Sequence, residues 1–234
     1  KNSFFELIKT LFYAGIIAII FRSLFFEPFN IPSGSMIPSL LVGDYLFVSK
    51  YSYGYSKYSF PFGVMPIEGR FLEQHPKRGD IIVFRKPGQE NIDYIKRLVG
   101  LPGDNVQVIN GILHVNDKAS TRTKTNLGKT KNSIGDTILV NEYIEQFEDS
   151  NFHKIIEASD YDLFDNTIKF KVPIGHYFFM GDNRDNSRDS RTSEVGFVPK
   201  INLIGKAERI FFSHNGSASF YEFWKWHDLI RFSR

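Results

Sequence analysis

Cysteine is absent from the 234-residue chain. This absence excludes disulfides, iron–sulfur clusters, Cys-ligated zinc and thiolate nucleophiles, so any nucleophile has to be serine, threonine, lysine or a carboxylate. A large charge of either sign is also lacking, because the formal net charge is only +3. A nucleic-acid-binding face normally needs a much higher concentration of basic residues. We therefore predict that nucleic acid is not a partner.

Recognisable metal and nucleotide motifs are missing as well. The six histidines are isolated, and no H-E-x-x-H spacing occurs among them, so we predict no metal site. Gly128-Lys129-Thr130 resembles the end of a phosphate-binding loop, but Thr123 occupies the position that requires the first glycine. The sequence therefore predicts no cofactor and no nucleotide partner.

The longest apolar run lies near the N-terminus. Residues 10–21 contain no charged side chain, but 12 residues reach only about 18 Å along a helix, whereas the hydrocarbon core of a bilayer is about 30 Å thick. A helix over residues 4–26 would be long enough to span it. A cleaved signal peptide and a buried core helix are the alternatives, but no small-residue cleavage site follows Arg22. We favour an uncleaved transmembrane anchor over residues 1–26.

The rest of the chain has the pattern of a mainly β protein. Short runs of alternating apolar and polar residues are separated by clusters of Gly, Pro, Asn and Asp, and Asn110-Gly111 is a strong signal for a two-residue hairpin turn. Long helical periodicity is absent after residue 30, and one short helix is possible at 199–203. The predicted strands are 45–48, 80–84, 94–99, 106–109, 112–115 and 177–179.

Two further stretches bear on membrane binding. Residues 118–131 carry five basic residues and no acidic one, which favours a solvated loop or hairpin tip, with attraction to anionic lipid headgroups as the alternative. Aromatic residues crowd the segment 211–226, and its Trp224-Lys225-Trp226 cluster is typical of a membrane interface. We predict that this segment helps to seat the body of the protein on membrane lipid.

Three segments could carry chemistry. In the first, Gly34 permits a close turn between Ser33 and Ser35, while prolines keep the flanking backbone extended. This pattern would hold a serine hydroxyl rigidly, although the segment taken by itself favours an ordinary Ser-Gly turn. The third segment, residues 180–191, is a dense polar loop that does not match a calcium-binding loop, and internal ion pairs would account for it.

The second segment is an apolar strand that contains a lysine. Alternation would place Ile92, Tyr94, Lys96 and Leu98 on one face of the strand. Burial lowers a lysine pKa from about 10.4 by up to 3–5 units, and a neutral lysine can then act as a general base. The alternative is a lysine at a sheet edge whose ammonium group reaches water.

Several motifs of this chain, in this order, resemble those of the bacterial type I signal peptidases (leader peptidases). They are P-S-G-S-M-x-P-S-L from Pro32, G-D-Y-L-F-V from Gly43, R-G-D-I-I-V-F from Arg78, Y-I-K-R-L-V-G-L-P-G-D from Tyr94 and G-D-N-R-D-N-S-x-D-S-R from Gly181. The resemblance implies an antiparallel-sheet catalytic body with a smaller inserted β region. The expected division is anchor 1–26, catalytic core 27–104, inserted accessory β region 105–173 and second part of the core 174–234.

The resemblance also implies a catalytic assignment. Ser35 corresponds to the nucleophile and Lys96 to the general base, Ser33 to an oxyanion donor and Ser187 to the hydroxyl that orients the lysine. Asp189 and Arg191 correspond to a structural ion pair, whereas Arg188 departs from the small residue that is often found at its position. The residues that match the substrate-pocket lining are Phe29, Ile31, Met36, Leu40, Tyr94 and Ile95.

The implied activity is removal of N-terminal signal peptides from secretory precursors after small residues of the Ala-x-Ala type. The implied location is the bacterial cytoplasmic membrane, with a single span as the chain stands and the catalytic body on the outer face. Two alternatives are a non-catalytic, membrane-anchored β-domain that binds peptides and a peptidase for a narrow set of precursors.

Overall fold

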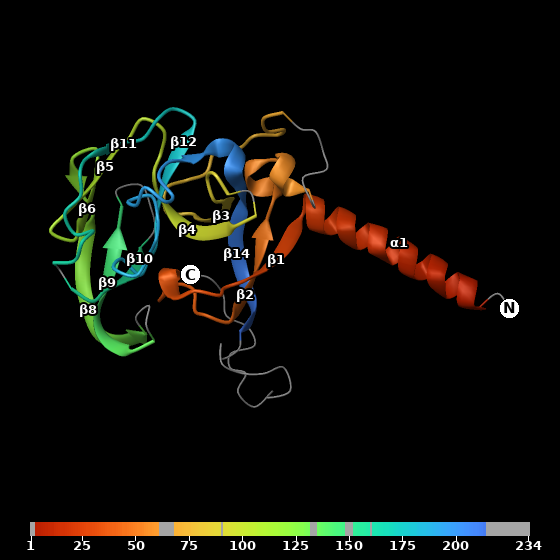
Figure 1. Cartoon of the computed structure of the whole chain (residues 1–234), viewed down its shortest axis with the longest axis horizontal. Helices are drawn as coiled ribbons and strands as arrows, with labels where there is room; N and C mark the ends of the chain where they lie inside the picture. Colours follow the sequence, from red (N-terminus) through yellow and green to blue (C-terminus); the bar gives the residue numbers. More distant parts are fainter. Residues whose placement is uncertain are drawn as a thin grey trace.

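The structure is a computed structural model that describes residues 3–60, 68–89, 91–131, 135–147, 152–159 and 161–213. It consists of one long helix, three antiparallel sheets and several short 3-10 helices (Figure 1). The predicted mainly β class with one N-terminal apolar helix is confirmed.

Helix α1 (Ser3–Leu24) contains 22 residues and extends away from the β body (Figure 1). At about 1.5 Å per residue its length is about 33 Å, enough to cross a bilayer. Its most apolar window of 18 residues has a mean hydropathy of 2.0, and none of that window is buried inside the protein. A core helix would be covered by its own protein, so this exposure excludes that alternative for α1.

The largest sheet has seven strands in the order β1-β2-β14-β3-β4-β12-β13. Every neighbouring pair is antiparallel. The strands are β1 (Phe26–Asn30), β2 (Asp44–Ser49), β3 (Ile81–Arg85), β4 (Asp93–Gly100), β12 (His176–Met180), β13 (Val198–Pro199) and β14 (Leu203–Ser213).

Strand β14 lies inside this sheet, between β2 and β3, although the sequence did not predict it. Its pairing register with β2 shifts between Ala207 and Arg209 and again between Ile210 and Phe212. Each shift breaks the alternation of inward and outward side chains. Period-two pattern recognition therefore has little to detect in this segment.

Hydrophobic clusters cover both faces of the large sheet. On β3, Ile81 and Val83 pack into a cluster with Leu46 and Val48, whereas Ile82 and Phe84 pack into a different cluster. Successive side chains of a strand point to opposite faces, so an unbroken apolar strand such as β3 must be buried on both sides. This double burial gives the neighbouring strand β4 a rigid support.

Two small sheets contain the strands between residues 105 and 171. A four-stranded sheet has the order β11-β5-β6-β7, and a three-stranded sheet has the order β10-β9-β8. The strands are β5 (Asn105–Ile109), β6 (Ile112–Val115), β7 (Lys118–Ala119), β8 (Thr121–Lys131), β9 (Thr137–Gln146), β10 (His153–Glu157) and β11 (Phe170–Lys171). They lie at the end of the body opposite α1 (Figure 1). The division of the chain into domains stays a prediction.

The hairpin turn and the short helix that the sequence predicts are both present in the structure. Asn110 and Gly111 have φ values of 48° and 72° and join β5 to β6, as the hairpin signal predicted. The short helix expected near 199–203 is the 3-10 helix η5 (Lys200–Asn202). The other 3-10 helices are η1 (Gly34–Met36), η2 (Tyr51–Tyr53) and η3 (Lys57–Ser59).

The basic stretch 118–131 was assigned wrongly as a solvated loop or hairpin tip. It forms β7 and β8, and ten residues of β8 pair with β9. Its threonines are β-branched and favour strands, and Thr130 is buried on the face that also carries Val140. The predicted lipid-binding cluster around Trp224 and Trp226 lies outside the described residues.

Candidate active site

Ser35 is the middle residue of the 3-10 helix η1 (Gly34–Met36), and Ser33, which precedes this helix, has an extended backbone. The backbone N–H of Ile37 donates to the carbonyl oxygen of Gly34 at 3.2 Å and closes this turn. Ser35 is 9% exposed. The turn therefore holds one hydroxyl in a nearly buried position, as the Ser-Gly-Ser pattern allowed.

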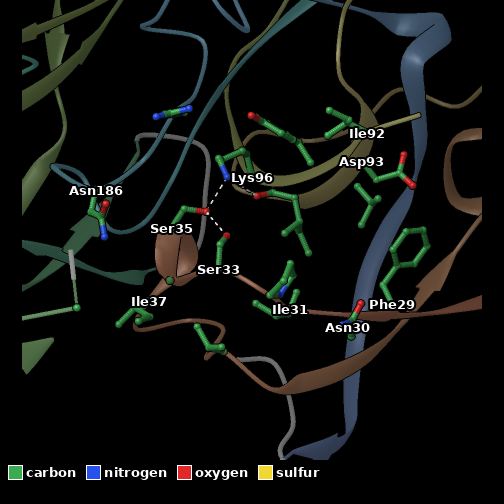
Figure 2. A pocket seen from close by; sticks show the side chains of 18 residues that line it. Phe29, Asn30, Ile31, Ser33, Ser35, Ile37, Ile92, Asp93, Lys96 and Asn186 are labelled. Atoms are coloured by element: carbon green, nitrogen blue, oxygen red, sulfur yellow. Dashed lines mark hydrogen bonds between the residues drawn. The ribbon is translucent and has the colours of Figure 1, made fainter. Parts of the chain in front are cut away.

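Lys96 reaches this hydroxyl from strand β4. Its Nζ lies 2.7 Å from Ser35 Oγ, although the two residues are 61 positions apart in the chain (Figure 2). Nζ also donates to the carbonyl oxygen of Ile95 at 3.0 Å and lies 5.2 Å from the centre of the Tyr94 ring. Lys96 is 4% exposed, which excludes the sheet-edge alternative in which its ammonium reaches water.

Burial lowers the pKa of Lys96 from 10.5 to about 8. Asp189 and Asp182 act in the opposite direction, and Arg191 assists the lowering. Desolvation is the largest of these effects because the charged ammonium loses its hydration inside the protein. A substantial fraction of Lys96 is consequently neutral near pH 8, as a general base requires.

Two further serines were predicted at this site. Ser33 Oγ lies 3.4 Å from Ser35 Oγ, on the solvent-exposed side of the turn. Ser187 is 4% exposed, and within the described residues its hydroxyl makes no hydrogen bond to Lys96. The structure thus brings Ser33 close to Ser35, whereas the predicted contact between Ser187 and Lys96 is not present.

The loop that carries Ser187 is held by two buried ion pairs. Asp189 accepts from Arg191 at 2.9 and 2.8 Å, and Asp182 accepts from Arg97 at 2.7 and 2.6 Å. Burial by itself raises the pKa of a carboxyl group, but the arginines outweigh this effect and keep the pKa of both aspartates below the usual range. The sequence resemblance pointed to the first pair only.

Asn183 connects the same loop to the turn that carries Ser35. Its backbone N–H donates to the carbonyl oxygen of Ser35 at 3.1 Å, and its side-chain amide donates to the carbonyl oxygen of Gly34 at 3.1 Å. Ile156 of strand β10 hydrogen-bonds to the residues on both sides of Asn183. Sequence reasoning missed Asn183, since its motif identified a polar loop without indicating what the loop contacts.

A groove of about 760 Å³ runs past Ser35 and Lys96 (Figure 2). Four of the six predicted substrate residues line it: Phe29, Ile31, Tyr94 and Ile95. The other two, Met36 and Leu40, are fully buried in the core cluster that includes Ile31, so they support the groove from below. Lining residues that the sequence did not identify include Ile37, Val42, Val83, Ile92 and Asp93.

The described residues contain no group of three or more His, Cys, Asp or Glu side chains that could hold a metal ion. The polar groups at the bottom of the groove are a hydroxyl and an amine. They can support acyl transfer through an activated serine without a further ligand.

Comparison with known proteins agrees with this geometry. The sequence profile of the family "Signal peptidase, peptidase S26" matches residues 4–212. Signal peptidases I from Rickettsia typhi (strain ATCC VR-144 / Wilmington) and Rickettsia akari (strain Hartford) are each 44% identical to this chain over 207 and 204 residues. These matches cover 84% of this chain and 76% and 75% of the two relatives.

A solved structure of a signal peptidase I from Enterococcus faecalis V583 is 26% identical, with a TM-score of 0.34, and covers 57% of this chain and 97% of its own. The family assignment rests on the sequence matches rather than on this superposition. Together with helix α1, the assignment indicates a membrane-anchored protein. The chain belongs to the signal peptidase family S26, and it is therefore a serine peptidase that acts in signal-peptide cleavage.

Proposed function

We propose that this protein is a membrane-bound endopeptidase that removes signal peptides by means of a Ser35/Lys96 dyad. The observation that carries the proposal is the 2.7 Å separation of Lys96 Nζ and Ser35 Oγ at the bottom of an open groove. A general base has to lie within hydrogen-bond reach of the proton that it removes, and this pair satisfies that condition.

In the proposed reaction, neutral Lys96 accepts the hydroxyl proton while Ser35 Oγ attacks the carbonyl carbon of the scissile peptide bond. The tetrahedral intermediate collapses when Lys96 returns the proton to the leaving amide nitrogen, which breaks the C–N bond and leaves an acyl ester on Ser35. Lys96 then takes a proton from water, the hydroxide adds to the ester carbon, and Ser35 leaves with the proton. Atoms and charges balance, and Lys96 ends neutral.

The oxyanion of the intermediate would be stabilised by the Ser33 hydroxyl and the backbone N–H of Ser35. The position of Ser33 Oγ, 3.4 Å from Ser35 Oγ, supports this role because the oxyanion would form next to Ser35 Oγ. One such donor contributes about 10²–10³ in rate. The buried Ser187 hydroxyl lies beside the Asp189 carboxylate and helps to lower its pKa, and we assign it the role of orienting Lys96.

Substrate preference follows from the shape and chemistry of the groove. Its lining near Ser35 is apolar, with Ile31, Val83 and Ile95 close to the dyad, which supports a preference for small apolar residues of the Ala-x-Ala type before the cleaved bond. Residues 93–96 of β4 pair with β3, and β12 pairs only with the part of β4 from Arg97 onward. An extended substrate can therefore add as a further strand along this part of β4.

The position of the anchor supports secretory precursors as substrates. Helix α1 ends at Leu24, eleven residues before Ser35, so the dyad would lie close to the membrane surface where a translocated precursor emerges. We place the catalytic body on the outer face of the cytoplasmic membrane. Seating of the body on membrane lipid remains part of the proposal.

The test is cleavage of a signal-bearing precursor by the full chain in detergent. We expect Ser35→Ala and Lys96→Met to abolish cleavage, whereas the exposed control variants Ser193→Ala and Lys154→Met should cleave like wild type. Circular dichroism and thermal melting of each variant separate loss of chemistry from loss of folding. Normal cleavage by folded Ser35→Ala or Lys96→Met would refute the dyad. A panel of unrelated precursors would distinguish a general peptidase from one with a narrow set of substrates.

A further inference from the structure

The groove continues beyond the nucleophile on the side away from its apolar lining. Phe29, Ile92 and Asp93 lie on one side of Ser35, and Asn186 lies on the other (Figure 2). Ile37 lies on the same side as Asn186 (Figure 2). Arg188, two residues after Asn186 in the chain, also lines the groove, as does Gly135, which precedes strand β9. Arg188 adds a cation to the groove lining.

The proposed function, on which this inference rests, sets the direction of the bound substrate. Apolar residues before the cleaved bond occupy the half with Phe29 and Ile92, because that half has the matching chemistry. The acyl carbon lies at Ser35 Oγ. Since an extended chain continues in one direction, the first residues of the released mature protein must cross the half with Asn186 and Arg188.

The guanidinium of Arg188 is exposed to solvent and only weakly paired with a carboxylate. Its side chain is 78% exposed, and its ion-pair partner Glu194 lies 3.6 Å away, beyond ideal hydrogen-bond distance. The same carboxylate accepts a hydrogen bond from Lys86 at 2.6 Å. One carboxylate is thus shared between two cations, and the closer cation is Lys86. The guanidinium of Arg188 can consequently accept a second carboxylate.

We propose that Arg188 forms a subsite that favours an acidic side chain among the first residues after the cleavage site. A guanidinium presents paired N–H donors that match the two oxygens of a carboxylate. Because Arg188 is exposed at the edge of the groove, its effect is modest and sensitive to salt. This assignment also gives a role to the residue at which the chain departs from the small side chain expected in its motif.

The test uses three synthetic peptides that share one signal-peptide cleavage sequence and differ only after the cleaved bond. The first three residues there carry one Asp, one Lys or no charge. We expect wild type to cleave the Asp peptide with a kcat/KM about two- to fivefold above that of the Lys peptide, the range of an exposed ion pair. Arg188→Glu should invert this ratio, Arg188→Lys should preserve its direction, and 1 M salt should bring the wild-type ratio close to one.

Lys154→Glu is the matched control, since it makes the same charge change at an exposed position of β10 outside the groove. An Asp-to-Lys ratio that is unaffected by Arg188→Glu, or that shifts equally in Lys154→Glu, would overturn the subsite. If the uncharged peptide is still cleaved when the subsite is overturned, the proposed function is not contradicted. If wild type cleaves none of the three peptides, the proposed function fails and the subsite fails with it.

Discussion

The backbone N–H of Asn183 donates a hydrogen bond to the carbonyl oxygen of Ser35 at 3.1 Å, so the loop that contains Asn183 holds the turn that carries Ser35. The side-chain amide of Asn183 holds the same turn through Gly34. On its other side, this loop is held by Ile156 of the small three-stranded sheet. The small three-stranded sheet is therefore connected to Ser35 through this loop.

We expect Asn183→Ala to lower kcat by about 2- to 10-fold with little change in KM. The substitution removes one of the two donors to the Gly34 carbonyl and leaves the backbone N–H of Ile37, a loss of about 0.5–1.5 kcal/mol, while the groove lining remains intact. Steady-state kinetics with a fluorogenic signal-peptide substrate would measure this effect. The exposed Asn166→Ala serves as control. A raised KM at unchanged kcat would show that Asn183 contributes to binding instead.

Gly181 is a position at which an added side chain would clash with its surroundings. A Cβ there would lie 2.2 Å from Ser187 Oγ and 2.5 Å from the carbonyl oxygen of Ser35, far closer than atoms can approach. We expect Gly181→Ala to displace the nucleophile turn and to remove most of the activity. Gly175→Ala is the control, because it has a φ of +76° but open space around the added Cβ; it should cost about 1–2 kcal/mol of stability and retain activity. Comparable activities of the two variants would contradict the importance of this close packing.

The lowered pKa of Lys96 predicts the pH dependence of the reaction. Only the neutral amine accepts the serine proton, so kcat/KM should rise about tenfold per pH unit in the acidic range and level off above a midpoint near pH 8. Measurements between pH 6 and pH 9.5 cover the transition. A flat profile over this range, with the protein folded throughout, would argue against Lys96 as the base.

The same pKa predicts that Lys96→Met stabilises the protein at neutral pH. The pKa of Lys96 is about 8 in the folded protein and 10.5 for an unperturbed lysine. Below pH 8 the charged lysine therefore lowers the free energy of unfolding by ~3 kcal/mol, because the unfolded chain binds its proton more tightly. Replacing the lysine removes that destabilisation. The lost hydrogen bond to Ser35 offsets it by about 1 kcal/mol.

Thermal melting across pH would check this expectation. The stability advantage of Lys96→Met over wild type should be largest below pH 8 and should shrink as pH rises toward 10.5, because wild type gains stability over that interval. A lower melting temperature for Lys96→Met at pH 7 would contradict it. Lys154→Met, at an exposed position, provides the comparison for loss of a positive charge.

Glu145 should stabilise the inserted region in a pH-dependent manner. It is fully buried, pairs with Arg184 and accepts from His153 at 3.1 Å. Burial alone would raise the pKa of Glu145, but Arg184 and His153 outweigh it and hold this pKa well below its usual range. The stabilisation is therefore present above the unfolded pKa of about 4.5 and is lost as pH falls below it.

Removal of the Glu145 carboxylate leaves the buried guanidinium of Arg184 without this ion-pair partner. Glu145→Ala should therefore lower the free energy of unfolding by about 3–5 kcal/mol at pH 7. Glu145→Gln keeps a hydrogen-bond acceptor and should lose less. Chemical denaturation at pH 7 and pH 4 would measure both effects. If Glu145→Ala is as stable as wild type at pH 7, the buried pair contributes nothing.

Local properties of the chain were readable from the sequence. The apolar composition of residues 4–26 predicts helix α1, period-two alternation predicts β4 and its neighbours, and Asn110-Gly111 predicts a hairpin turn because few other residues tolerate the required backbone angles. Ordered motifs also placed Ser35 and Lys96 in the family pattern. Each of these signals depends on residues that are close together in the chain.

Long-range contacts were not readable in this way. Three features join segments that are distant in the chain. Lys96 approaches Ser35 to 2.7 Å, and Asn183 hydrogen-bonds to the turn that carries Ser35. Met36 and Leu40 are buried beneath the groove. Strand β14 escaped detection because its register shifts erase the alternation that reveals other strands. The amino-acid order thus determined which groups are available and which local elements form. Side-chain packing between sheets determined which groups meet, since proton transfer depends on separations of about 3 Å that only the folded core can hold.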